Sequence, residues 1–141
     1  MSKRFRPENS GESRLISRIE TSKEYERRRS IHAVGEVIGA LGNALSSKLV
    51  ENRLVETNNT NALREQMEYC LERLSKADDF DIDYQVAPLR NLVANPHVVT
   101  LYITAFVIEQ LIKHPEIIDI YGSDEEIYAC IHRQVVRYLM T

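Results

Sequence analysis

The segment from His97 to Lys113 constrains the fold more than any other part of the chain. Drawn as a helix, it is apolar on nearly every side, although Glu109 and Gln110 interrupt the run. A helix of this kind is either buried at the centre of a domain or lies in a subunit interface. Val, Ile and Thr are frequent enough here to suggest a strand, but the length of the run favours a helix.

Length and composition place the chain among globular proteins. It has 141 residues, which fits one domain, and 43% of them are hydrophobic and 28% charged. The first seven residues contain no apolar run of the kind that a signal peptide needs. The apolar run after His97 is shorter than the roughly 20 residues of a membrane span. We therefore expect a soluble cytoplasmic protein that does not associate with a membrane.

Helical periodicity dominates the rest of the sequence. Besides residues 97–113, apolar residues recur at helical spacing over residues 31–55, 62–76, 84–93 and 124–139. This pattern predicts an all-α helical bundle with five main helices, and a sixth if residues 13–30 form a helix of their own. Those residues could equally extend the next helix or be disordered. We predict a flexible, basic N-terminal arm over residues 1–12 and a single helical domain over residues 13–141.

Local signals mark where several of these helices begin. Thr60 or Asn61 can cap the helix over residues 62–76, and Asn95 followed by proline suits the start of the apolar helix. Ser123 and Glu126 have the spacing of a capping box for the last helix. Between the last two helices, residues 115–121 are expected to form a short turn of helix. Residues 78–83 are expected to form an acidic connection between the helices over residues 62–76 and 84–93.

Three glycines lie on one stripe of the helix predicted over residues 31–55. Gly35, Gly39 and Gly42 cost that helix about 1 kcal/mol each relative to alanine. Close approach of another helix backbone would offset this cost, whether that helix belongs to the same chain or to a second copy. With Tyr102 and Phe106 of the apolar helix, these glycines are our candidates for a helix crossing or subunit interface. We expect Gly39→Leu to disrupt packing or assembly.

Charge divides the chain into two unlike parts. Residues 1–29 hold nine basic and five acidic residues, whereas residues 30–141 hold nine basic and sixteen acidic ones. The basic part suggests contact with the phosphates of a nucleic acid, although the acidic remainder opposes docking on a duplex and a solvated charged face is the simpler interpretation. The residues concerned are Lys3, Arg4, Arg6, Arg27, Arg28 and Arg29.

One narrow polar strip interrupts the first long helix. His32 and Glu36 are spaced one helical turn apart and share this strip with Asn43. A carboxylate that orients an imidazole could line a small-molecule pocket within the bundle. The alternative is that the strip is the edge of the helix that faces solvent.

Several common chemistries lack their motifs. No glycine-rich phosphate loop, nucleophile elbow or helical metal-binding pair occurs in the sequence. The series Asp79-x-Asp81-x-Asp83 begins like a calcium loop, but Tyr84 occupies the position that requires glycine. Cys70 and Cys130 are expected to be reduced packing residues. We therefore predict no catalytic residue, cofactor or metal.

These observations favour a non-enzymatic helical protein-interaction or assembly module. A bundle of this size can cover one fully apolar helix, but a second apolar face is best hidden in another subunit, so we predict a homodimer. A further protein partner is compatible with this prediction. The alternatives are a nucleic-acid-associated protein that binds through its basic arm and a helical bundle that binds a small molecule.

Overall fold

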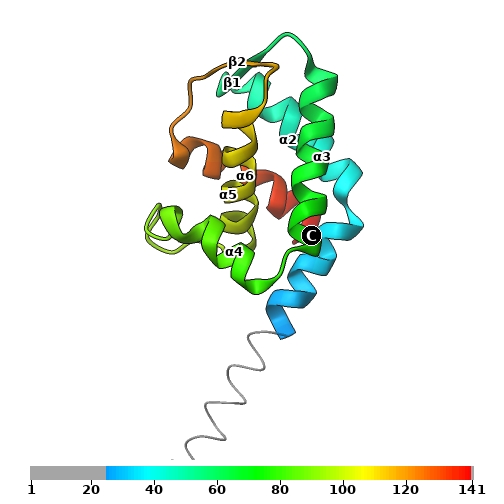
Figure 1. Cartoon of the computed structure of the whole chain (residues 1–141), viewed down its shortest axis with the longest axis vertical. Coiled ribbons are helices and arrows are strands. Elements are labelled where there is room, and N and C mark those ends of the chain that lie inside the picture. Colours follow the sequence, from blue (N-terminus) through cyan, green and yellow to red (C-terminus); the bar gives the residue numbers. More distant parts are fainter. Residues whose placement is uncertain (1–24, 141) are drawn as a thin grey trace, which may run out of the picture. The chain divides into compact units, whose positions relative to one another are not determined.

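The described part of the chain begins with helical residues. In the computed structural model, the placement of residues 25–140 is defined, and the chain divides into two units, residues 1–30 and residues 31–141. Of the first unit, only residues 25–30 are described, and they are helical. The predicted arm over residues 1–12 lies outside the described residues. The second unit, which also begins with helical residues, holds all the elements described below (Figure 1).

Four long helices of this unit form an all-α bundle, which confirms the predicted fold class. They are α2 (Ile38–Glu51), α3 (Thr60–Lys76), α5 (Val98–Lys113) and α6 (Asp124–Leu139). Helix α2 packs on α3 and α6, and α5 packs on the same two helices. Each helix therefore turns an apolar face toward the same core, which includes Leu41, Leu71, Phe106 and Ile131.

The predicted helix over residues 31–55 is shorter than expected, because two features interrupt it. A turn at Val37 separates residues 31–36 from α2. Helix α2 then ends where Arg53 adopts a positive φ of 59°. The amide of Leu54 donates to the carbonyl of Leu49 at 3.0 Å, which is the hydrogen bond of a Schellman motif.

Side-chain caps begin most of the other helices, close to the positions expected from the sequence. Asn59 caps α3, one residue before the expected position. Ser123 and Glu126 form the predicted capping box of α6. The prediction for α5 was wrong by two residues, because His97 rather than Asn95 is its cap and accepts a hydrogen bond from the amide of Thr100.

The acidic segment after α3 is a helix, which corrects two predicted boundaries. Helix α4 covers Asp79–Val86 and continues into a short 3-10 helix, η2 (Ala87–Leu89). The sequence had suggested a connection over residues 78–83 and a helix over 84–93. Asp78 caps α4, and the aspartates of its first turn complement the positive end of the helix dipole. These charges, which look like a loop signal, therefore stabilise the start of a helix.

A small antiparallel ribbon replaces the helical turn expected over residues 115–121. Strand β1 (Val55–Thr57) pairs with β2 (Ile117–Ile120), and Val55 lies opposite Ile120. Next to this pairing, the amides of Tyr121 and Gly122 both donate to the carbonyl of Leu54. In Figure 1 the ribbon and α4 lie at opposite ends of the bundle. Within residues 25–140, no helix combines the length and apolar character needed to cross a membrane.

Candidate functional site

The outer face of α4 exposes two aromatic side chains. Phe80 and Tyr84 are 76% and 71% exposed, although Ile82 and Val86 on the opposite side of this short helix are buried. Aspartates adjoin both aromatic residues in the sequence, and residues 78–83 contain four aspartates and no basic residue. We call this set the α4 surface; it consists of Phe80, Tyr84, Asp79, Asp81 and Asp83.

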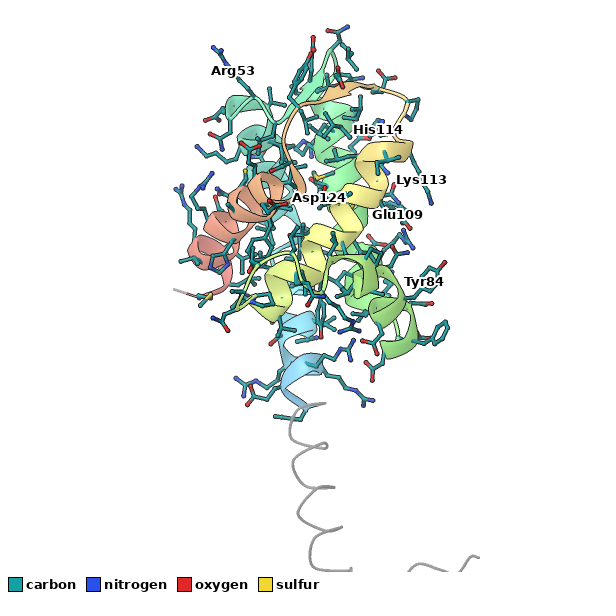
Figure 2. All side chains as sticks on the ribbon, turned by 90° about the vertical axis from the view of Figure 1, so that its left-hand side faces the viewer. Arg53, Tyr84, Glu109, Lys113, His114 and Asp124 are labelled. Atoms are coloured by element: carbon teal, nitrogen blue, oxygen red, sulfur yellow. The ribbon has the colours of Figure 1, made fainter. Side chains whose placement is uncertain are left out.

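A groove of about 340 Å³ adjoins the α4 surface. Tyr84 and Asp81 belong to both the surface and the groove lining. Figure 2 shows Tyr84 on the same side of the bundle as Glu109 and Lys113 of α5. The groove lies in the volume range of small binding sites in proteins. Its lining comes from α3, α4 and α5 and consists of Glu72, Arg73, Lys76, Ala77, Asp81, Tyr84, Gln85 and Phe106.

Both basic side chains of this groove are already paired. The guanidinium of Arg73 lies 3.2 Å from the carboxylate of Glu109, and the ammonium of Lys76 lies 3.2 Å from that of Glu72. Arg73 also lies over the ring of Phe106, 5.5 Å from its centroid, which is a cation–π geometry. The groove therefore offers a rigid aromatic and polar wall rather than an open anion site.

The pairing also sets the protonation state of Glu109. Burial would raise the pKa of its carboxyl group, but hydrogen bonds from Gln85 and Arg73 and the charges of Lys113 and Arg73 lower the pKa overall. Glu109 therefore stays ionised at neutral pH, and it links α3, α4 and α5 beside the groove. A carboxylate held in this way is a structural anchor rather than a proton donor.

The cysteines and carboxylates show no arrangement typical of an active site. Burial raises the pKa of the Cys70 thiol to about 12, so that this thiol is unreactive at neutral pH. Both Cys70 and Cys130 are buried and free. Among residues 25–140, no group of three or more His, Cys, Asp or Glu side chains has the geometry to hold a metal ion.

A cluster of polar side chains joins the start of α5 to α6. We call it the histidine cluster; it consists of His97, Thr100, Tyr128 and His132. The Thr100 hydroxyl lies 3.1 Å from Nδ1 of His97 and 2.8 Å from Nδ1 of His132. The two histidine rings are 5.4 Å apart between centroids, and the ring of Tyr128 stacks on that of His132. The backbone amide of His97 donates to the Tyr128 hydroxyl at 2.8 Å. The start of α5 is therefore tied to α6 by polar groups as well as by apolar packing.

The three candidate glycines differ in how close the neighbouring atoms lie to them. A Cβ atom on Gly42 would lie 3.2 Å from the backbone nitrogen of Glu68, so Gly42 marks a close crossing of α2 and α3. A Cβ atom on Gly35 would be in ordinary contact with Ser75 at 3.4 Å. No described atom lies within 4 Å of the corresponding position on Gly39. Among the described residues, Gly39 therefore takes part in no close helix crossing, contrary to the expectation from the sequence.

The apolar helix is covered by its own chain. Tyr102 and Phe106 of α5 are 9% and 2% exposed, and α3, α4, α6 and β2 all contact this helix. The sequence left open whether this helix is buried at the centre of the domain or in a subunit interface, and its own chain is enough to bury it at the centre. Its apolar composition alone gives no argument for a second subunit.

The remaining sequence candidates lie on exposed helix surface or outside the described residues. His32 and Glu36 lie 3.8 Å apart, with side chains that are 80% and 69% exposed. Asn43 is exposed on α2, and none of the three lines the groove. Arg28 and Arg29 are exposed and Arg27 is partly buried on the helical residues 25–30. The other basic candidates, Lys3, Arg4 and Arg6, lie outside the described residues.

Sequence reasoning missed both the α4 surface and the histidine cluster. A signal for the first was present, because Phe80 and Tyr84 have helical spacing and follow a capping aspartate. The cluster offered a weaker signal, since only the spacing of His97 and Thr100 fits a helix start. Its third member, His132, reaches the site through tertiary packing that sequence spacing does not reveal.

Comparisons with known proteins identify no relative. No protein-family model matches the chain, and neither the curated proteins nor the solved structures contain a significant match. The assignment of function therefore depends on the described residues alone.

Proposed function

We propose that this chain is a non-enzymatic helical module that binds a positively charged segment of another protein through the α4 surface. The observation that carries the proposal is the exposure of Phe80 and Tyr84, two large aromatic side chains one helical turn apart. Exposed aromatic side chains of this kind are the residues that most often dominate protein interfaces.

Charge supports the choice of a basic partner. Asp79, Asp81 and Asp83 alternate with the apolar residues along α4, so the helix that carries the two rings is acidic. The carboxylate of Asp83 lies 3.6 Å from Arg90, and this ion pair is weak because both side chains are more than half exposed. Lysine or arginine side chains on either side of an apolar anchor would complement this surface.

The adjoining groove gives such an anchor a place to bind. It is about 340 Å³ in volume, and its lining includes the Tyr84 and Phe106 side chains. Since Arg73 and Lys76 are paired within the chain, they add little net positive charge to repel a basic segment. An aromatic or aliphatic side chain of the partner would enter the groove while its basic neighbours contact the aspartates.

A random peptide library displayed on phage tests this proposal with the full-length chain as bait. We expect the selected peptides to be enriched in lysine or arginine around an apolar residue, and to bind more weakly as salt is raised. Combined Phe80→Ala and Tyr84→Ala substitution should weaken that binding by about tenfold or more. Ile118→Ala is the matched control, because Ile118 is also exposed but lies on β2 at the other end of the bundle.

Three outcomes would overturn the proposal. The first is the selection of acidic peptides or of none, and the second is binding that the α4 variant leaves unchanged. The third comes from light scattering of the unliganded chain. A dimer that the α4 variant dissociates would show that a second copy occupies this surface.

A further inference from the structure

The histidine cluster between α5 and α6 lies outside the proposed interaction surface, and its hydrogen bonds depend on the protonation state of His97. The backbone amide of Thr100 donates to Nδ1 of His97 at 3.3 Å, which is the N-cap hydrogen bond of α5. An imidazole nitrogen can accept this hydrogen bond only when it carries no proton. The cap therefore requires a neutral His97 with its proton on Nε2.

The Thr100 hydroxyl completes the neutral network. Its oxygen lies 3.1 Å from Nδ1 of His97 and 2.8 Å from Nδ1 of His132, so the hydroxyl bridges the two rings, and the tautomer of His132 decides which atom donates in the shorter contact. A fully protonated His132 donates from Nδ1 to the hydroxyl oxygen, so this contact survives protonation of that ring. A proton on Nδ1 of His97 instead faces the Thr100 amide, donor against donor, and the cap is lost. The two rings thus respond differently to protonation.

We propose that His97, Thr100 and His132 form a pH-sensitive latch, which holds the N-terminus of α5 against α6 while His97 is neutral and releases it when His97 is protonated. The inference goes beyond the proposed interaction function and does not depend on it. Among the helices of residues 25–140, α5 alone has a histidine as its side-chain N-cap; the others that have one are capped by Asn59, Asp78 and Ser123.

The surroundings of His97 set the direction of the response. Among residues 25–140, the recorded titratable partners of His97 are His132, whose ring lies beside its own, and Tyr128, whose hydroxyl accepts from its backbone amide; its own helix contributes the uncharged Thr100. Burial, and then the charge of His132, lower the pKa of His97 below its ordinary value. The unfolded chain therefore binds this proton more tightly than the folded chain does. The stabilisation is complete above the ordinary pKa of histidine, about 6.5, and is lost as pH falls through the folded pKa.

Amide hydrogen exchange, corrected for the intrinsic effect of pH, tests the latch in the full chain. We expect protection of the Thr100 and Leu101 amides to fall by about threefold or more between about pH 7.5 and about pH 5.5. In His97→Asn the loss should be below about twofold, because asparagine caps helices without titrating in this range. Equal losses in the two proteins, or no loss in the wild type, would overturn the proposal.

A second variant tests the coupling between the rings without touching the cap. His132→Gln removes the neighbouring charge, so the NMR titration midpoint of the His97 ring should rise toward the ordinary value. Tyr121, which is exposed and pairs with Glu56 beside the ribbon, offers a matched control as Tyr121→Phe. An unchanged His97 midpoint in His132→Gln, with the ring spectra of a folded protein, would show that the two histidines do not act together.

Discussion

Helices α4 and α5 each carry two aromatic side chains four residues apart, yet the two pairs have opposite surroundings. Phe80 and Tyr84 of α4 are 76% and 71% exposed, whereas Tyr102 and Phe106 of α5 are 9% and 2% exposed. The aromatic spacing is the same. The difference comes from the residues between the aromatics and from the neighbours that each helix meets.

In α5 the three residues between the aromatics, Ile103, Thr104 and Ala105, are all buried. Helices α3, α4 and α6 surround them, so that almost every direction from the helix is covered. In α4 the corresponding positions include two aspartates, Asp81 and Asp83, which need water. Aromatic spacing thus predicts a helix, and the polarity of the intervening residues indicates whether its aromatic face is buried or available to a partner.

The largest effect is expected on the α5 side of this comparison. Phe106→Ala removes a 2% exposed ring from the centre of the bundle and should lower the free energy of unfolding by about 3–5 kcal/mol. Chemical denaturation monitored by circular dichroism measures this loss. A loss below about 1 kcal/mol would place Phe106 among peripheral residues, in contradiction to its burial.

The same contrast between packed and open surroundings recurs in the glycines of α2. A methyl group on Gly42 would press on the backbone of Glu68, so Gly42→Ala should destabilise the fold by about 1–3 kcal/mol. Gly39→Ala meets no described atom within 4 Å and should be neutral or stabilising by up to about 1 kcal/mol, because alanine favours helices. Thermal unfolding of the two variants gives the signs. Destabilisation by Gly39→Ala would contradict the open surroundings that the described residues leave around Gly39.

Sequence reasoning found some local signals, misread others, and failed where the partners come from far along the chain. The capping box of Ser123 and Glu126 lies within one helical turn and was predicted correctly. The pairing of Val55 with Ile120 joins segments that are distant in sequence, and each strand is too short to show alternation. Helix α4 was missed because its aspartates resemble a loop, although they act as a cap and first turn.

Helix α4 should depend strongly on its N-cap, because it is half the length of α5 and only one of its faces is buried. The Asp78 side chain accepts a hydrogen bond from the amide of Asp81 at 2.8 Å, and α4 has only eight residues. Asp78→Ala should therefore cost about 1 kcal/mol and increase hydrogen exchange within α4. Asp78→Asn is the control, because asparagine caps equally well. Equal exchange in the two variants would mean that tertiary contacts of Ile82 and Val86 hold α4 without the cap.

The smallest effect on stability is expected where the largest effect on binding is proposed. Phe80→Ala and Tyr84→Ala remove side chains that are mostly in water, so each should change the free energy of unfolding by no more than about 0.5 kcal/mol. Chemical denaturation of the double variant checks this expectation under the same conditions as Phe106→Ala. A loss above about 2 kcal/mol would show that the rings already stabilise the chain's own fold. An unchanged stability with weakened peptide binding would separate the two aromatic pairs completely, with one pair holding the bundle together and the other available to a partner.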